Sequence, residues 1–461
     1  MYREETIAAI STPLGEGGIG IVKISGEKAL EILNKVFVTK DLKEKKSWDP
    51  RKMYYGLIRN PMNQERIDEV LAVYMKAPNT YTKEELVEIH CHGGMVPLRK
   101  TLQLVLDQGA SVAEKGEFTK RAFLNGRLDL SQAEAVMDLI SAKTDVSHEV
   151  ALGQFEGLLS RKIKGIQNIL KDMLAQIEVS IDFSEEDIDE VTLDYLLSKS
   201  KRAKESFEEL LQSAKTGKIL REGLLTGILG KTNVGKSSLL NALLRENRAI
   251  VTDIPGTTRD VIEEQLNVRG IPLKIIDTAG IRDTEDAVEK IGVQRSREIF
   301  KQADLVIFMI DASKKLDQED YDFLQLIKDR RALVVINKTD LEEAIDLSRI
   351  QEIIGDKKIV RISLLKNKGL KTLEDALEEM VYEGETFNKE QPLITNTRHH
   401  QAINQGLKSL EEGIQALENQ MPLDFVEVDI KNAWKSLGEV TGDTVSEDIL
   451  DHIFENFCIG K

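Results

Sequence analysis

The sequence contains few cysteines and lacks both a long apolar run and an excess of positive charge. Its two cysteines, Cys91 and Cys458, exclude a disulfide framework and are typical of a reducing compartment. No apolar run approaches the ~20 residues that a membrane span needs. The first ten residues, MYREETIAAI, lack the apolar core of a signal peptide. We therefore expect a cytoplasmic protein with no membrane-embedded part.

Positive charge is outweighed by negative charge across the chain. Lysine and arginine number 63 against 79 aspartates and glutamates, which leaves a formal net charge of −16. This balance argues against a broad basic face for nucleic acid, because phosphate binding needs clustered cations. It leaves room for a local basic patch, or for RNA that is held mainly by a partner.

Length and composition indicate several globular domains. The 461 residues suffice for about three domains, and 41% are hydrophobic. Residues 1–120 contain two strand-like runs, Ile19–Ile24 and Val70–Met75, and a helix-like run at Leu98–Leu106. This mixture predicts an α+β domain.

The next two segments differ in periodicity. Residues 121–218 contain no proline and place apolar residues three and four apart, which predicts helices. Residues 219–382 alternate apolar runs with helical spacing, which predicts a mostly parallel sheet covered by helices. The predicted strands are Leu224–Leu229, Leu273–Ile276, Leu305–Ile310, Leu333–Ile336 and Ile359–Ile362.

Helical spacing returns over residues 383–461. The simplest architecture is therefore an all-α helical domain made of residues 121–218 and 383–461, into which an α/β domain is inserted at residues 219–382. The predicted fold class is multidomain, with an N-terminal α+β domain, an all-α helical domain and an inserted α/β domain.

A full Walker A motif lies between a predicted strand and a predicted helix. It reads Gly230-Lys231-Thr232-Asn233-Val234-Gly235-Lys236-Ser237 and is followed by Ser238. Glycines let backbone N–H groups wrap phosphates, and the helix N-terminus adds positive potential. Lys236 is expected to reach the β- and γ-phosphates, and Ser237 to bind magnesium.

Further motifs complete a guanine-nucleotide site in chain order. Thr258 is the expected magnesium threonine of switch I, and Gly280 offers an N–H to the γ-phosphate. Asp340 can accept two hydrogen bonds from guanine, whereas adenine has no such edge, so we expect hydrolysis of GTP rather than ATP. The motif residues are Thr252, Asp253, Ile254, Pro255, Gly256, Thr257, Thr258, Asp277, Thr278, Ala279, Gly280, Asn337, Lys338 and Asp340.

The residue after Gly280 is Ile281, where many GTPases place the glutamine that orients the attacking water. Another group must therefore activate the water, in this chain or in trans. Glu289 is the nearest attractive carboxylate, although an exposed helix-face glutamate is the simpler interpretation from sequence. Asn233 offers a carboxamide oxygen that could ligate a monovalent cation beside the phosphates.

Motifs outside the P-loop domain give the chain a family resemblance. They are Gly17-Gly18-Ile19-Gly20, Glu88-Ile89-His90-Cys91-His92-Gly93-Gly94, Gly116-Glu117-Phe118-Thr119-Lys120-Arg121, and the closing Cys458-Ile459-Gly460-Lys461. With the inserted GTPase motifs, the chain resembles the MnmE (TrmE) family of tRNA-modification GTPases over nearly its whole length. Departures from the family pattern include Glu16, Lys115 and Ser184.

The resemblance implies an N-terminal domain that binds folate and dimerises. It implies a homodimer that acts with the FAD-dependent partner MnmG in a heterotetramer. Together they would add an aminomethyl or carboxymethylaminomethyl group to carbon 5 of the tRNA wobble uridine. A tetrahydrofolate derivative, in the 5-formyl or 5,10-methylene form, would supply the one-carbon unit. The tRNA would be held largely by the partner.

The resemblance also assigns residue roles. Potassium would be bound by Asn233, Thr252, Ile254 and Thr257, and Glu289 would orient the catalytic water through a second water. The residues with catalytic roles would be Glu289, Lys236, Thr258 and Gly280. Magnesium would be bound by Ser237 and Thr258.

The folate pocket maps to Lys23, Glu88, Arg127 and Lys461. The family often has arginine at 23 and lysine at 127, so charge is kept here but the geometry of the guanidinium fork is not. The role of Cys458 stays open between folate chemistry and packing, and a structural role is favoured for His90 and His92.

Two other functions fit parts of the sequence. A ribosome-assembly GTPase switch would share Gly256-Thr257-Thr258-Arg259-Asp260, but such proteins carry tandem GTPase domains or an RNA-binding domain with a Gly-x-x-Gly loop. This chain has one Walker A motif and no such loop after residue 383. A GTP-driven scaffold without folate chemistry is the other alternative.

Overall fold

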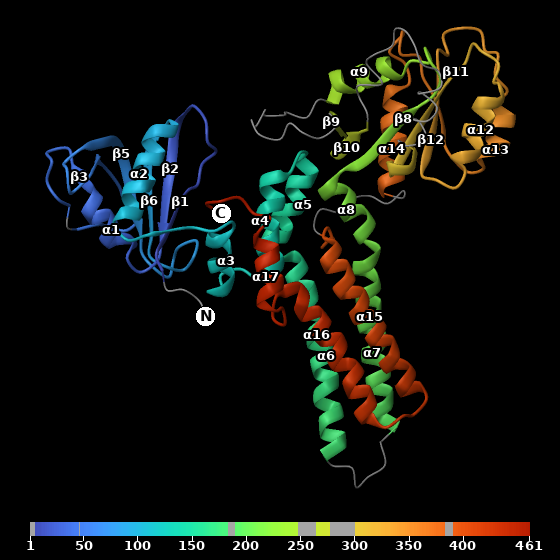
Figure 1. Ribbon diagram of the computed structural model, residues 1–461. Helices are drawn as coiled ribbons and strands as arrows, with labels where there is room; N and C mark the ends of the chain where they lie inside the picture. Colours follow the sequence, from blue (N-terminus) through green and yellow to red (C-terminus); the bar gives the residue numbers. More distant parts are fainter. Residues whose placement is uncertain (1–4, 46, 183–189, 248–263, 277–299, 383–390) are drawn as a thin grey trace. The chain divides into compact units, whose positions relative to one another are not determined.

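The computed structural model describes residues 5–45, 47–182, 190–247, 264–276, 300–382 and 391–461 (Figure 1). Contacts divide the chain into two compact units. One unit combines Met1–Met137 with Lys435–Lys461, and the other is Asp138–Trp434. Each unit has its own sheet, so each is described by itself.

The first unit is built on a seven-stranded sheet of order β3-β4-β5-β6-β2-β1-β7, in which β1 and β7 pair in parallel and the other pairs are antiparallel. Its strands are β1 Ile7–Ile10, β2 Gly17–Ser25, β3 Phe37–Thr39, β4 Met53–Arg59, β5 Arg66–Met75, β6 Leu86–Gly93 and β7 Ser111–Val112. Its helices are α1 Ala29–Val36, α2 Met95–Asp107, α3 Glu117–Leu124, α4 Leu130–Ser141 and α17 Glu447–Phe454.

Alternation along these strands decides which sheet face is covered. Val22 and Ile24 of β2 point into a core that includes Leu33 of α1 and Leu98 of α2. Lys23 lies between Val22 and Ile24 and therefore faces the opposite side of the sheet. Helices α1 and α2 thus cover one face, and the charged residues of the predicted folate pocket belong to the other.

The second unit combines long helices with a six-stranded sheet of order β13-β12-β11-β8-β10-β9, parallel except for the β9–β10 hairpin. Its strands are β8 Leu224–Leu229, β9 Glu264–Val268, β10 Ile271–Ile275, β11 Leu305–Asp311, β12 Ala332–Asn337 and β13 Ile359–Arg361. The helices are α5 Asp145–Phe155, α6 Leu158–Asp182, α7 Glu190–Gln212, α8 Ala214–Glu222, α9 Lys236–Asn247, α12 Gln318–Leu326, α13 Leu347–Ile354, α14 Leu370–Tyr382, α15 Thr397–Glu418 and α16 Leu423–Thr441.

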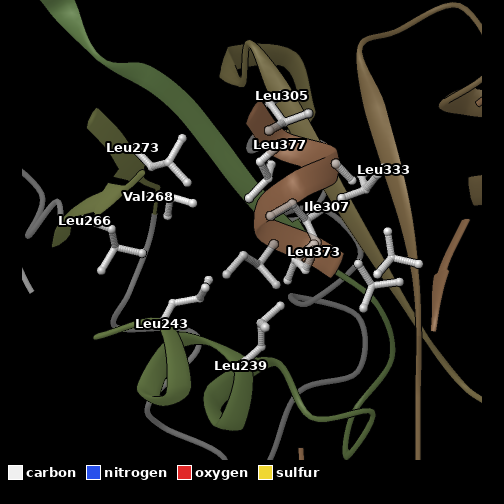
Figure 2. Packing of buried hydrophobic residues seen from close by; sticks show 14 of the residues in the cluster. Leu239, Leu243, Leu266, Val268, Leu273, Leu305, Ile307, Leu333, Leu373 and Leu377 are labelled. Carbon is white, nitrogen blue, oxygen red and sulfur yellow. The ribbon is translucent and has the colours of Figure 1, made fainter. Parts of the chain in front are cut away.

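Strand β11 shows why this sheet is covered on both faces. All seven of its residues are buried. Leu305 and Ile307 belong to one core with Leu239 of α9 and Leu373 of α14, all four labelled in Figure 2. Val306 and Phe308 belong to the second core, with residues of α12 and α13. A continuous apolar strand between two layers of helices is typical of parallel α/β sheets.

The structure confirms the predicted fold class, and each predicted strand run falls on a strand. Helix α2 likewise contains the predicted run Leu98–Leu106. Among the described residues, no helix combines the length and the apolar character of a membrane span.

Candidate nucleotide site

The phosphate-binding loop joins β8 to α9. Gly230 and Gly235 have φ values of +142° and +109°, which side chains rarely tolerate. A Cβ atom would lie 2.4 Å from the Met309 carbonyl oxygen at Gly230, and 2.3 Å from Asn337 Nδ2 at Gly235. The two glycines are therefore required both by backbone conformation and by close approach to β11 and β12.

Lys236 crosses this loop. Its Nζ donates hydrogen bonds to the carbonyl oxygens of Gly230 and Lys231, each at 2.7 Å. Burial lowers the pKa of Lys236, because a desolvated ammonium is penalised unless an anion compensates it. The position is therefore suited to a phosphate oxygen.

The base-recognition segment follows β12 and is tied to the loop. Asn337 Nδ2 donates to the Val234 carbonyl at 2.8 Å, and Asn337 Oδ1 accepts from the Leu364 backbone N–H at 3.3 Å. Asn337 is 3% exposed and so acts as a buried brace rather than as a surface group. Asn337 therefore connects the phosphate-binding loop to the loop that follows β13.

Asp340 is held by the loop that follows β13. Ser363 Oγ donates to Asp340 Oδ1 at 2.5 Å, and this bond lowers the pKa of the Asp340 carboxyl. The carboxylate is therefore ionised at neutral pH. Such a group can accept from the N1–H and the 2-amino group of guanine.

A cavity of about 720 Å³ opens between these segments. It also reaches Leu365, in the position after Leu364, and Asn241 and Arg245 of α9, which the sequence analysis did not single out. Val234, by contrast, is buried in the core and offers only its backbone. The predicted residues that line the cavity are Asn233, Gly235, Lys236, Ser237, Ser238, Asn337, Lys338 and Asp340.

The predicted switch residues lie outside the described part of the chain. This applies to Thr252, Asp253, Ile254, Pro255, Gly256, Thr257, Thr258, Asp277, Thr278, Ala279, Gly280 and Glu289. Their predicted roles are therefore taken up below as proposals.

Sequence reasoning also missed two carboxylates next to these segments. Asp311 ends β11 and contacts Lys338, and Asp320 of α12 contacts Lys231 of the loop, each with an N–O distance of 2.6 Å. The position of Asp311 was a usable signal, because polar residues at the carboxyl ends of parallel strands face the ligand-binding edge.

The first unit holds a separate charged cluster on the sheet face that α1 and α2 leave open. Lys23 and Glu88 are direct neighbours on β2 and β6. Burial lowers the pKa of Lys23, Glu88 raises it in part, and the charge of Lys461 lowers it further. Four residues far apart in sequence contribute, because Arg127 joins the cluster through Tyr81.

Tyr81 lies between the two cations of this cluster. Arg127 Cζ is 4.6 Å from the centroid of the Tyr81 ring and Lys23 Nζ is 5.8 Å from it. Arg127 Nη1 also donates to the Tyr81 carbonyl at 3.2 Å, and Tyr81 exchanges a hydrogen bond of 2.9 Å with the Thr119 hydroxyl. No local sequence pattern points to Tyr81, because its contacts depend on tertiary proximity.

His90 and His92 have other partners. His90 Nε2 is 3.1 Å from Glu88 Oε2, and His92 Nδ1 is 2.7 Å from Asp68 Oδ1. Within the described ranges, no group of three or more His, Cys, Asp or Glu side chains forms a metal site. These contacts fit the structural role expected for both histidines.

The fold and the cavity define the class of protein. A glycine loop between a central parallel strand and a helix is typical of phosphate-binding sites, and Asn337-Lys338-Thr339-Asp340, at the same sheet edge, has the pattern typical of guanine recognition. The second unit therefore contains a P-loop GTPase domain.

Comparisons with known proteins extend this assignment. The chain matches the model of the MnmE helical domain over residues 130–458 and that of the GTP-binding protein TrmE N-terminus over residues 6–127. Among solved structures, the G domain of the T. maritima FeoB iron transporter aligns at 24% identity with 34% of this chain and 98% of its own, with a TM-score of 0.25.

Full-length relatives are more similar. The tRNA modification GTPase MnmE of Alkaliphilus oremlandii is 61% identical over all of both chains. The protein of that name from Clostridioides difficile is 53% identical over the full length of both chains, and that from Bacillus licheniformis is 48% identical over 99% of this chain and 100% of its own. This chain belongs to the MnmE family of tRNA modification GTPases.

Proposed function

We propose that the chain is the GTP-hydrolysing component of a complex that modifies the tRNA wobble uridine at carbon 5, adding an aminomethyl or carboxymethylaminomethyl group. The observation that carries the proposal is the presence of two dissimilar sites in one chain: the guanine-nucleotide cavity and the cation cluster around Lys23. A ribosome-assembly switch or a simple scaffold needs only the first.

In the nucleotide site, Lys236 binds the β- and γ-phosphates in place of the loop carbonyls that it now contacts. Asp340 reads the guanine edge. Ser237 lies in the first turn of α9 and lines the cavity, so its hydroxyl suits magnesium, with Thr258 as the second protein ligand. Magnesium, when bound, neutralises charge on the phosphates.

Asn233 has a φ of +61° and lines the same cavity. Its carboxamide oxygen is a hard ligand of the kind that suits potassium, and Thr252, Ile254 and Thr257 complete the proposed set. We place the GTPase domains of two chains in contact when this cation is bound. Glu289 orients the hydrolytic water, Thr258 and Gly280 contact the γ-phosphate, and Ile281 does no polar work.

The cation cluster suits a folate. A pterin presents hydrogen-bond donors that match the Glu88 carboxylate, and its glutamate tail is an anion that Lys23, Arg127 and Lys461 attract. The buried ammonium of Lys23, which its surroundings destabilise, would gain from such an anion. The folate, in the 5-formyl or 5,10-methylene form, supplies the one-carbon unit.

Partners follow from the charge of the chain. With a net charge of −16, the chain offers little general attraction to RNA, so a flavin-dependent partner, MnmG, holds most of the tRNA in the proposed heterotetramer. We place the homodimer and this assembly in the cytoplasm.

The decisive experiment measures GTP turnover in matched potassium and sodium buffers over a range of protein concentrations. We expect turnover that rises with potassium and with protein concentration and is lost in sodium. Equal turnover in both salts would leave a GTPase but remove the cation mechanism. In the same assay Glu289→Ala should keep GTP binding and lose most hydrolysis, and near-normal turnover would exclude its role.

A further inference from the structure

Asp311 is a buried carboxylate that belongs to none of the GTPase motifs. It is the last residue of β11 and stands directly beside Asn337 in the parallel β11–β12 pair. Its side chain is 4% exposed. A charged group so buried requires partners that satisfy both of its oxygens.

The two oxygens of Asp311 have different partners. Oδ1 accepts from the Ser313 backbone N–H at 3.0 Å and from the Ser313 hydroxyl at 2.7 Å, whereas Oδ2 accepts from Lys338 Nζ at 2.6 Å. Burial alone would raise the pKa of Asp311, but the bonds from Lys338 and Ser313 hold it below its usual value. The Asp311 carboxyl is therefore ionised at neutral pH.

Lys338 directly follows β12 and has an unusual backbone conformation. Its φ is +62°, in the left-handed region that non-glycine residues rarely adopt. Its side chain is about one-third exposed and lines the nucleotide cavity together with Asp340 and Leu364. A lysine stem is long and flexible, so fixing it only when a ligand binds costs conformational entropy.

We propose that Asp311 is a positioning residue for guanine nucleotides: by holding the ammonium of Lys338, it fixes the methylene stem of that lysine as one wall of the base pocket. The stem is apolar and suits the flat face of a purine, while the charge stays at Asp311. The Lys338 side chain thus loses its conformational entropy on folding rather than on ligand binding. This raises the affinity for the nucleotide, although Asp311 itself makes no contact with the ligand.

A purely structural role makes a different prediction. The bonds from Ser313 close the turn after β11 and involve neither Lys338 nor the cavity. If Asp311 served only this turn, its replacement would lower the thermal stability of the protein and leave nucleotide release unchanged.

The test measures the dissociation rate of a fluorescent GDP from the full chain by stopped flow. Asp311→Asn preserves shape and the Ser313 contacts but removes the charge that holds Lys338. We expect release to be about tenfold faster, since hydrogen bonds between charged groups are worth more than neutral ones. The KM for GTP should rise by a similar factor, and kcat should fall by less than about threefold.

A matched variant and a double variant complete the design. Glu378→Gln removes one carboxylate from an ion pair with Arg269, at 2.8 Å in the same domain and away from the cavity lining, and should release GDP at the wild-type rate. Lys338→Met keeps an apolar stem without the ammonium, and it should match Asp311→Asn. The double variant Asp311→Asn/Lys338→Met should be no worse than Lys338→Met alone.

Two results would overturn the proposal. One is a wild-type release rate in a folded Asp311→Asn protein. The other is a wild-type release rate in Lys338→Met, which decides the matter even if Asp311→Asn does not fold, because it would show that the ammonium need not be held.

Discussion

The nucleotide cavity and the cation cluster differ in how the chain assembles them. The cavity is built from short contiguous segments at one edge of a parallel sheet, and backbone groups do much of the work. The cluster brings together single side chains from distant positions on and around a mostly antiparallel sheet, namely Lys23, Glu88, Arg127 and Lys461. A contiguous site depends on local backbone conformation, whereas a dispersed site depends on the whole unit being folded.

Lys236→Ala should separate the two sites most clearly, because it should affect the nucleotide cavity and not the cation cluster. This variant removes the loop charge that we propose to bind the β- and γ-phosphates, so GTP turnover should fall by at least about 100-fold. Binding of 5-formyltetrahydrofolate should not change. The control is Lys371→Ala on the exposed side of α14. A parallel loss of folate binding, measured by calorimetry, would mean that the two sites are not independent.

A smaller effect is expected from Gly235→Ala. The added Cβ would lie 2.3 Å from Asn337 Nδ2 in a left-handed backbone, so it should break the brace between the loop and β12. We expect the Kd for GDP to rise about tenfold, the scale of a strained backbone residue. Gly355→Ala is the matched control, because Gly355 has a φ of +67° but nothing within 4 Å of its Cβ position. Equal Kd values for the two variants would contradict the prediction, because Gly355 lies outside the cavity lining.

The smallest effect should come from the dispersed site. Lys23→Met removes one of several cations, so affinity for 5-formyltetrahydrofolate should fall about fivefold to tenfold, with no change in GTP turnover. Lys76→Met, at an exposed position just after β5, provides the control for lost charge. Unchanged folate affinity in Lys23→Met would remove this residue from the proposed pocket.

The same contrast explains how much the sequence could predict. The strand at Leu305–Ile310 and the Walker A loop could be predicted from the sequence, because neighbouring residues define both the periodicity of a strand and the chemistry of a loop. Lys23 and Lys461 came only through family resemblance, since no spacing connects them. Tyr81 and Asp311 were missed, because their contacts form only when separate strands and loops pack together.

The two segments of the first unit, Met1–Met137 and Lys435–Lys461, are synthesised at different times. Lys435–Lys461 packs with Met1–Met137, and the Gly116 and Phe118 backbone N–H groups donate to the carbonyl oxygens of Cys458 and Lys461. A ribosome that adds about 5–20 residues per second must first make all of Asp138–Trp434, a delay of about 15–60 s. During that interval the first unit lacks its second segment, although all seven strands of its sheet, Ile7 to Val112, have already been synthesised. The cation cluster can therefore be completed only after Lys461 has been made, well after its other members.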